Sequence, residues 1–304
     1  MSLDADVRVD RRRLKRRLIF WRIAAVVAIV AAVLVGLNRN RPIFESPHIA
    51  RLSVNGVILD DPDRNELLEQ VKDDPAIKAV MVRIDSPGGT VVGGENLYRH
   101  LRAIAAAKKP VVVTMGELAT SAAYMTAIAG DRIFAHEGSI TGSIGVILQT
   151  TDVTGLLSKL GVTTEALKSA PLKAVPSPLE PLTPEAREAT MDVIRDVFDT
   201  FKGLVAERRA LSADQVDKLA DGRVYTGRQA LKNGLIDAIG GEPEAIQWLG
   251  TAYGIDTRLP VRDLKPDEER RLWRDLIGSL AGKTLFSERL TLDGLISLWH
   301  PDLR

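Results

Sequence analysis

Residues 77–89 read IKAVMVRIDSPGG and carry the first clear signal of the fold. The run IKAVMVRI is nearly continuous in apolar side chains and rich in β-branched ones, which is typical of a strand buried in a parallel sheet. A second run of this kind, PVVVTM at 110–115, follows a helix-like stretch at 95–108. Strands that alternate with helices indicate parallel βαβ units, so we expect an α/β domain built on one sheet.

The alternation continues on both sides of these two strands. Ser212 precedes a helix-like stretch and is a suitable N-cap for it, while Gly234 follows another and is expected to end it. The other expected strands are 49–59 (as a strand pair), 132–135, 142–148, 163–166 and 235–238. The other expected helices are 63–73, 121–129, 153–160, 184–211, 212–221, 227–233 and 242–253.

The N-terminal segment predicts a membrane anchor. Residues 18–37 contain a single charge, Arg22, and twenty helical residues span about 30 Å, the thickness of a bilayer's hydrocarbon core. Eight basic residues precede position 23, so the positive-inside rule places the N-terminus in the cytoplasm and the chain beyond about residue 40 outside. A cleaved signal peptide and a buried soluble helix are the alternatives, and residues 36–38 make a poor cleavage site.

These features divide the chain into five parts. We expect a basic cytoplasmic tail at 1–17, the anchor at 18–37, a polar linker at 38–48, a folded domain at 49–255 and a C-terminal extension at 256–304. Apolar residues recur at helical spacing in the extension, at 272–280 and again at 292–299. This spacing predicts a helix that packs on the domain or on a neighbouring subunit, with a membrane-surface helix as the alternative.

Charge and cysteine content exclude several classes of function. Residues 1–41 hold ten basic and three acidic residues, so this segment carries +7 and the rest of the chain −6. An acidic body argues against a nucleic-acid partner, because phosphate binding depends on clustered Lys and Arg. The chain contains no cysteine, which excludes disulfides, thiolate metal sites and a cysteine nucleophile.

Three loops concentrate residues that could carry chemistry. Gly88 and Gly89 follow the strand at 77–84, and adjacent glycines allow close approach of backbone N–H donors to a ligand. Ser121 stands between a buried strand and an alanine-rich helix, where it is a candidate nucleophile or an ordinary N-cap. The third loop, TGSIGV at 141–146, is followed by Lys168 and Lys173.

A serine nucleophile needs a base, and the chain offers histidines and lysines. Nothing in the sequence distinguishes His48, His100, His136 or His300 from ordinary surface histidines. A lysine replaces histidine in Ser–Lys dyads, where desolvation stabilises the neutral amine. Lys173 lies in the apolar, proline-bounded stretch APLKAVP at 170–176, which is unusual for a solvated lysine.

Several motifs resemble those of the signal peptide peptidase A (protease IV) family of membrane-anchored bacterial serine proteases, in its short single-domain form. The resemblance runs from about residue 49 to residue 246. Its motifs, in order, are IDSPGG (84–89), MGELATSAAY (115–124), DRIFAHEGSITGSIGVI (131–147), LKSAPLKAVPSP (167–178) and DGRVYTGRQALKNGLID (221–237). The resemblance implies a protease domain with a Clp-protease/crotonase-like ββα superhelix and a homo-oligomeric ring over the membrane.

The resemblance also implies a role for each site residue. Ser121 matches the family nucleophile, Lys173 the general base and Ser143 the serine that orients the lysine. Gly89 and Ala122 match the two residues whose N–H groups form the oxyanion hole. The family usually has Ser-Gly-Gly where this chain has SAA at 121–123, so the oxyanion hole requires a negative φ at residue 122.

The sequence therefore predicts a Ser–Lys endopeptidase that cleaves released signal peptides or other apolar peptides. We expect it in the inner membrane as a single-pass protein with a periplasmic catalytic domain, without metal or cofactor. Two other classes stay open. A crotonase-fold acyl-CoA enzyme shares the fold, although its chemistry uses carboxylates and needs no anchor. A membrane-tethered scaffold with a decayed site is disfavoured by the joint presence of the two serines and the lysine.

Overall fold

The computed structural model describes residues 17–31, 46–264 and 296–298. The chain divides into two units, one up to residue 45 and one from residue 46. Of the first unit, a helix at 17–31 is described, and its large apolar side chains are exposed. No helix among the described residues has both the length and the apolar character needed to cross a membrane. Residues 32–37 of the expected anchor lie outside the described residues.

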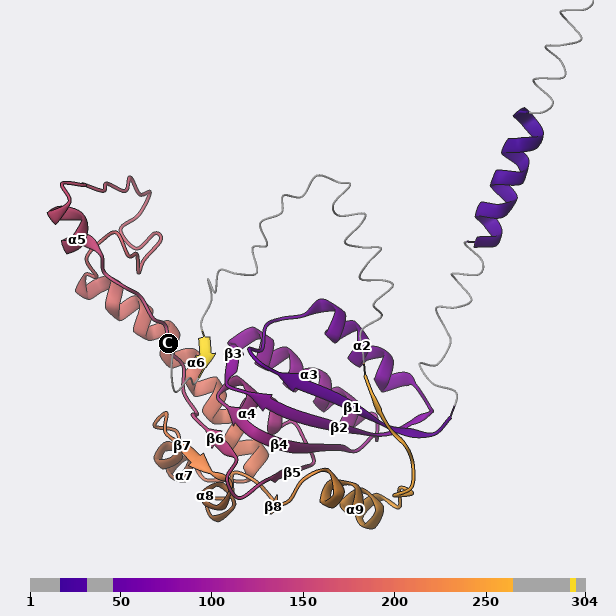
Figure 1. Ribbon diagram of the computed structural model, residues 1–304. Coiled ribbons are helices and arrows are strands. Elements are labelled where there is room, and N and C mark those ends of the chain that lie inside the picture. Colours follow the sequence, from indigo (N-terminus) through magenta and orange to yellow (C-terminus); the bar gives the residue numbers. More distant parts are fainter. Residues whose placement is uncertain (1–16, 32–45, 265–295, 299–304) are drawn as a thin grey trace, which may run out of the picture. The chain divides into compact units, whose positions relative to one another are not determined.

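The second unit is built on the expected α/β sheet. Its strands follow the order β7-β6-β4-β2-β1-β9, with β5 beside β4 and β8 beside β5 (Figure 1). Pairing is parallel throughout except between β6 and β7. The strands of this sheet are β1 (His48–Asn55), β2 (Ile77–Ser86), β4 (Val111–Thr120), β5 (Arg132–Ala135), β6 (Ile140–Gly142), β7 (Val224–Thr226), β8 (Ala238–Ile239) and β9 (Val261–Asp263).

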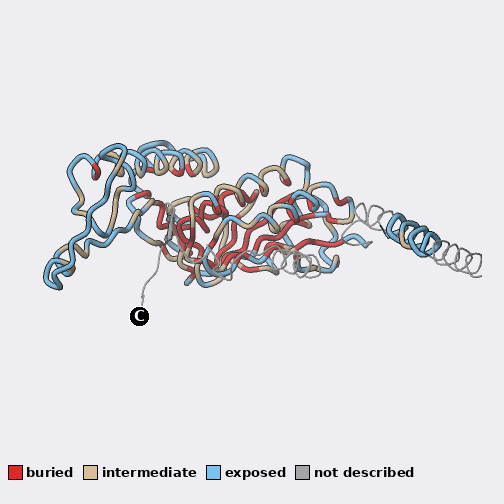
Figure 2. The backbone as a smooth tube through the Cα atoms, turned by 90° about the horizontal axis from the view of Figure 1, so that it is seen from above, coloured by how far each residue is buried: buried red, intermediate tan, exposed pale blue. Residues whose placement is uncertain are grey.

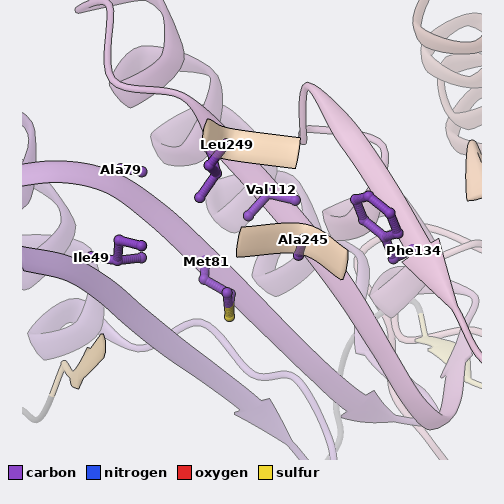
Figure 3. Close-up of a cluster of buried hydrophobic side chains, with 7 residues drawn as sticks. All are labelled: Ile49, Ala79, Met81, Val112, Phe134, Ala245 and Leu249. Atoms are coloured by element: carbon purple, nitrogen blue, oxygen red, sulfur yellow. The ribbon is translucent and has the colours of Figure 1, made fainter. Parts of the chain in front are cut away.

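Helices cover both faces of the sheet. Figure 3 shows one face, where side chains of four strands, Met81 among them, pack against Ala245 and Leu249 of α9. Side chains alternate along a strand, so Val80 and Val82 point to the opposite face, which α3 and α4 cover. The helices are α2 (Pro62–Asp73), α3 (Val91–Ala106), α4 (Ala122–Ala127), α5 (Thr154–Lys159), α6 (Pro184–Arg209), α7 (Ala213–Leu219), α8 (Gly227–Lys232) and α9 (Glu242–Tyr253).

An exposed arm leaves the sheet after β6. We call residues 145–182 the arm: it contains α5 and runs alongside α6, beyond the sheet (Figure 1). It is mostly exposed, in contrast to the buried sheet (Figure 2). The strands expected at 142–148 and 163–166 are wrong: β6 ends at Gly142 and no strand forms at 163–166. β-Branched residues form a strand only where a neighbouring strand pairs with them. Residues 163–166 are exposed and unpaired, and in the run at 142–148 the chain beyond Gly142 forms an isolated bridge at Ile147.

The C-terminal end of α6 is fixed to the sheet domain. Phe201 and Val205 are buried, and Arg208 donates from Nε to the carbonyl of Ile128, just after α4, at 2.9 Å. Arg209 forms an ion pair with Asp237 at 2.8 Å. At the other end of α6, by contrast, Ala186 is its one buried residue before Phe201. The long helix therefore joins the domain to the arm.

The extension contributes two strands. β9 pairs with β1, so the sheet continues past the expected boundary at residue 255. β10 (Ile296–Leu298) pairs antiparallel with β3 (Gly88–Thr90), and Ser297 stands opposite Gly89. The helix expected at 292–299 is therefore wrong for these three residues, which take their structure from a strand distant in sequence. The helix expected at 272–280 lies outside the described residues.

Candidate active site

Ser121 lies at the turn between β4 and α4. Its φ of 59° and ψ of −121° are unusual for a residue with a side chain, and such a conformation costs about 1–3 kcal/mol. The turn is held by Ser121 N, which donates to the carbonyl of Gly142 at 2.8 Å, and by Met125 N, which donates to the carbonyl of Ser121 at 2.9 Å. The serine side chain makes no capping hydrogen bond to α4, so the N-cap interpretation is wrong.

Alanine fits at position 122 without strain. Ser121 has a positive φ and Ala122 does not, so residue 122 has the negative φ that the proposed oxyanion hole requires. Its methyl group faces Gly94 of α3, where a Cβ would lie 3.0 Å from the Ala122 Cβ. The two helices therefore approach closely because a glycine stands opposite the alanine. Ala122 is fully buried at the first position of α4.

β3 places Gly89 in front of this turn. Ile58 N donates to the carbonyl of Gly88 and Thr90 N donates to the carbonyl of Ile58, both at 2.8 Å. The N–H and C=O of a trans peptide point in opposite directions, so the N–H of Gly89 is directed away from Ile58, towards the edge of β3 where β10 pairs and Ser297 stands opposite Gly89. A Cβ at Gly89 would lie 1.9 Å from the Ile58 carbonyl oxygen, so only glycine fits here. β3 also contacts α4, the helix that begins after Ser121.

Ser143 is placed beside Ser121 by the pairing of β4 with β6. Thr120 and Gly142 are partners in that ladder, and the two serines follow them directly. Ser143 has a φ of 50°, is 8% exposed and donates from its backbone N to the carbonyl of Arg223 at 2.8 Å. The structure therefore brings together Ser121, Ser143, Gly89 and Ala122.

Lys173 is not part of this group within the single chain. It lies in a turn of the arm and is exposed, whereas we expected it to be buried. Its backbone N donates to the carbonyl of Ala170 at 3.1 Å, and among the described residues its amine makes no hydrogen bond or ion pair. The expected burial of Lys173 is wrong within the single chain, because the arm contacts too few other residues to cover this side chain.

The other candidate bases have partners elsewhere. Lys168 is partly buried, and its amine forms an ion pair with Glu180 of the arm. His100 Nδ1 lies 3.0 Å from a Glu69 carboxylate oxygen. His48 is buried at the start of β1, and His136 is exposed beside Gly241; His300 lies outside the described residues. No group of three potential metal ligands occurs in the described part of the chain.

Tyr124 anchors α4, the helix that follows Ser121. Its hydroxyl donates to the carbonyl of Leu235 at 2.9 Å, and the side chain is fully buried. Burial raises the pKa of the Tyr124 phenol well above its ordinary value. The helix that follows Ser121 is therefore tied to the segment before β8.

Comparison with known proteins decides the family. Residues 103–256, half of the chain, match the profile described as peptidase family S49, and this region contains Ser121, Ser143 and Lys173. The chain belongs to peptidase family S49. As an S49 protein related to signal peptide peptidase A and protease 4, it is a serine-type endopeptidase.

Several proteins named as proteases are similar to this chain. A putative protease of Synechocystis is 39% identical over 68% of this chain and 75% of its own length. A putative signal peptide peptidase SppA of Enterococcus faecium is 35% identical over 66% of this chain and 62% of its own length. Protease 4 of Salmonella typhi is 35% identical over 65% of this chain, which is only 33% of the relative.

Among solved structures, a ClpP1 mutant of Listeria monocytogenes aligns with a TM-score of 0.41 and 17% identity. The alignment covers 63% of this chain and 91% of the ClpP1 chain.

Proposed function

We propose that this S49 peptidase is a membrane-anchored endopeptidase that uses a Ser–Lys dyad to cleave signal peptides or other apolar peptides outside the cytoplasm. The basic tail, the apolar run at 18–37 and the acidic remainder support the anchor and its orientation. The single observation that carries the chemistry is the strained, buried Ser121 at a strand-to-helix turn, with Gly89 of β3 in front of it.

In the proposed reaction, the Ser121 hydroxyl attacks the scissile carbonyl and its proton passes to the neutral amine of Lys173. The N–H groups of Gly89 and Ala122 stabilise the tetrahedral oxyanion. The Lys173 ammonium then protonates the leaving amine, and a water molecule hydrolyses the acyl-enzyme by the same route. Ser143, next to Ser121, orients the amine.

A second copy of the chain supplies Lys173 in this proposal. The amine is exposed in the single chain, and the arm that carries it also exposes several large apolar side chains, among them Leu160, Leu167 and Leu172. Such an apolar surface is typical of a segment that packs on a partner. Packing of the arm on a neighbouring copy would bury these leucines, desolvate Lys173 and bring its amine to that copy's Ser121, which requires a homo-oligomer.

Active-site labelling tests the nucleophile. A fluorophosphonate probe should label the full chain and not Ser121→Ala, and only the unsubstituted enzyme should shorten a synthetic signal peptide, as read by intact mass. An unlabelled, inactive protein would support the membrane-tethered scaffold instead. For the orientation, alkaline phosphatase fused after residue 45 should be active, and a silent fusion would contradict the periplasmic location.

Mixing two inactive variants tests the shared site. Ser121→Ala and Lys173→Ala are each expected to be inactive. When they assemble together, a site is complete wherever an intact Ser121 meets an intact Lys173 of its neighbour, which is about a quarter of the sites in a closed ring. Recovery of about that fraction of the activity supports the shared dyad. No recovery in co-assembled rings would place both residues in one chain.

A further inference from the structure

Two buried hydroxyl groups hold the same peptide unit at the entrance to β3. The Thr120 hydroxyl donates to the carbonyl of Pro87 at 3.0 Å, and Gly88 N donates to the hydroxyl of Ser86 at 3.1 Å. Both bonds act on the peptide that joins Pro87 to Gly88, one on its C=O and one on its N–H. Thr120 and Ser86 are both fully buried, so neither hydroxyl has water as a substitute partner.

This peptide unit directly precedes the one that presents Gly89 N–H. Gly88 has a φ of 108°, and the backbone of a glycine is less restricted by sterics than that of other residues, so the peptide that follows it is fixed by its hydrogen bonds. The two hydroxyls hold the first peptide. Ile58 N donates to the Gly88 carbonyl of the second peptide, and the Ser86 hydroxyl also donates to that carbonyl, at 3.4 Å. The direction of the Gly89 N–H is therefore determined by four hydrogen bonds on two successive peptides.

Thr120 also connects this loop to the nucleophile. It is the last residue of β4 and precedes Ser121, while its side chain reaches across to the strand that carries Gly89. Backbone pairing of Ser86 with Ala119 ends at this point, so the Thr120 side chain extends the connection between β2 and β4 beyond their ladder. The nucleophile and the oxyanion donor belong to separate βα units, and Thr120 bridges them.

We propose that Thr120 and Ser86 are positioning residues that clamp the Pro87–Gly88 peptide and so set the Gly89 N–H relative to Ser121. The inference rests on the proposed function, since it assumes that Gly89 N–H stabilises the oxyanion. Neither residue touches the reacting atoms. Their contribution appears in turnover, because misplacement of a preorganised donor weakens stabilisation of the transition state more than binding of the substrate.

The clamp itself is tested without any activity measurement. Amide hydrogen exchange of the full-length protein in detergent is followed over residues 84–92 by mass spectrometry. Thr120→Val keeps the side-chain shape and removes the donor, so exchange in this segment should accelerate about tenfold, whereas Thr120→Ser should exchange like the unsubstituted protein. Unchanged exchange in Thr120→Val would overturn the clamp, whether or not the protein is a peptidase.

Thr141→Val is the matched control. The Thr141 hydroxyl is also fully buried and donates to a β4 carbonyl, that of Ala119, at 2.7 Å, but it belongs to β6 and its hydrogen bond is not to the loop at 86–89. Its loss should cost similar stability without accelerating exchange over residues 84–92. Acceleration of equal size in Thr141→Val would show a general loosening of the sheet and overturn the specific role of Thr120.

Peptide hydrolysis tests the positioning role. Thr120→Val should lower kcat about tenfold with KM changed by less than about twofold, and Thr120→Ser should restore kcat. Ser86→Ala should act in the same direction. The double variant should lose little more than the worse single variant, because both hydroxyls hold one peptide unit. Faster exchange with unchanged kcat, or a defect confined to KM, would overturn the positioning role. An inactive unsubstituted enzyme would instead contradict the proposed function.

Discussion

The end of the sheet around Ser121 and the arm around Lys173 differ in how many contacts within the single chain hold each residue in place. At the sheet end, Ser121 is 1% exposed and its turn is held by bonds from β6 and α4. On the arm, Lys173 is exposed and its amine makes no hydrogen bond or ion pair within the described residues. The proposed nucleophile and the strand of the proposed oxyanion donor are thus held in place within one chain, whereas the proposed base lies on an arm that few residues of the same chain contact.

The largest expected effect comes from substitutions of Ser121 at the end of the sheet and of Lys173 on the arm. Ser121→Ala and Lys173→Arg should each reduce kcat by about a thousandfold or more, since a guanidinium does not deprotonate to act as a base. Lys168→Arg is the control, because it keeps a cation beside Glu180 and should retain most of the activity. Turnover is measured with a peptide substrate at saturation. Near-normal turnover of Lys173→Arg would remove Lys173 from the mechanism.

The next effect concerns β3, which carries the proposed oxyanion donor Gly89. Gly89→Ala should destabilise the protein by at least about 1–3 kcal/mol and abolish labelling by fluorophosphonate, because the added methyl group collides with the Ile58 carbonyl. Gly138→Ala is the control, since a Cβ there has nothing within 4 Å and its φ is not positive. Thermal unfolding and probe labelling are measured together. A Gly89→Ala protein that unfolds and labels normally would contradict the described packing of β3 on Ile58.

A smaller effect appears at alkaline pH. The pKa of Tyr124 is raised in the folded protein, so above about pH 10 the unfolded chain loses this proton while the folded chain keeps it. Stability from this group is therefore present below pH 10 and lost as the pH rises further. Tyr124→Phe should cost about 1 kcal/mol at neutral pH, through loss of the bond to Leu235, and should weaken this alkaline dependence. Urea unfolding of both proteins at pH 8 and pH 10.5 measures the loss of stability and its pH dependence. An identical pH dependence in the two proteins would contradict the raised pKa of Tyr124.

The smallest effect on folding is expected on the arm. Leu167 is 93% exposed, so Leu167→Ser should change the free energy of unfolding by less than about 0.5 kcal/mol. It should nevertheless shift the particle size in light scattering towards smaller species, because the arm is proposed to pack on a neighbouring copy. Val193→Ser, an exposed position on α6 outside the arm, serves as the control. If Leu167→Ser and Val193→Ser gave particles of equal size, Leu167 would have no role in assembly.

Local sequence patterns predicted the elements that local interactions stabilise. The buried strands at 77–84 and 110–115 are β2 and β4, and the helix expected at 184–211 is α6. Ser212 caps α7 through a capping box, as its position predicted. In each case the apolar run or the cap is contiguous in the sequence, so periodicity and capping rules suffice.

Features that depend on distant partners were not predicted. β3 is a three-residue strand without an apolar pattern, and β10 lies in a run whose apolar spacing predicted a helix. Each takes its structure from pairing, β3 with Ile58 and β10 with β3. The clamp formed by Thr120 and Ser86 gave no signal, since a buried hydroxyl looks like any other serine or threonine in a sequence. The apolar surroundings of Lys173 predicted burial, but the sequence does not show which molecule provides the cover.

The pairing of β9 with β1 has a consequence for the order in which the protein is made. Arg51 of β1 and Asp263 of β9 are 212 residues apart and share a hydrogen bond of 2.6 Å. The ribosome therefore releases almost the whole sheet before its last edge strand becomes available. Until then the free edge of β1, which carries the buried residues Ile49 and Leu52, presents unpaired backbone groups to any other extended chain. A nascent chain halted before residue 261 would carry Ser121, the proposed nucleophile, on a sheet that is prone to pair with other chains.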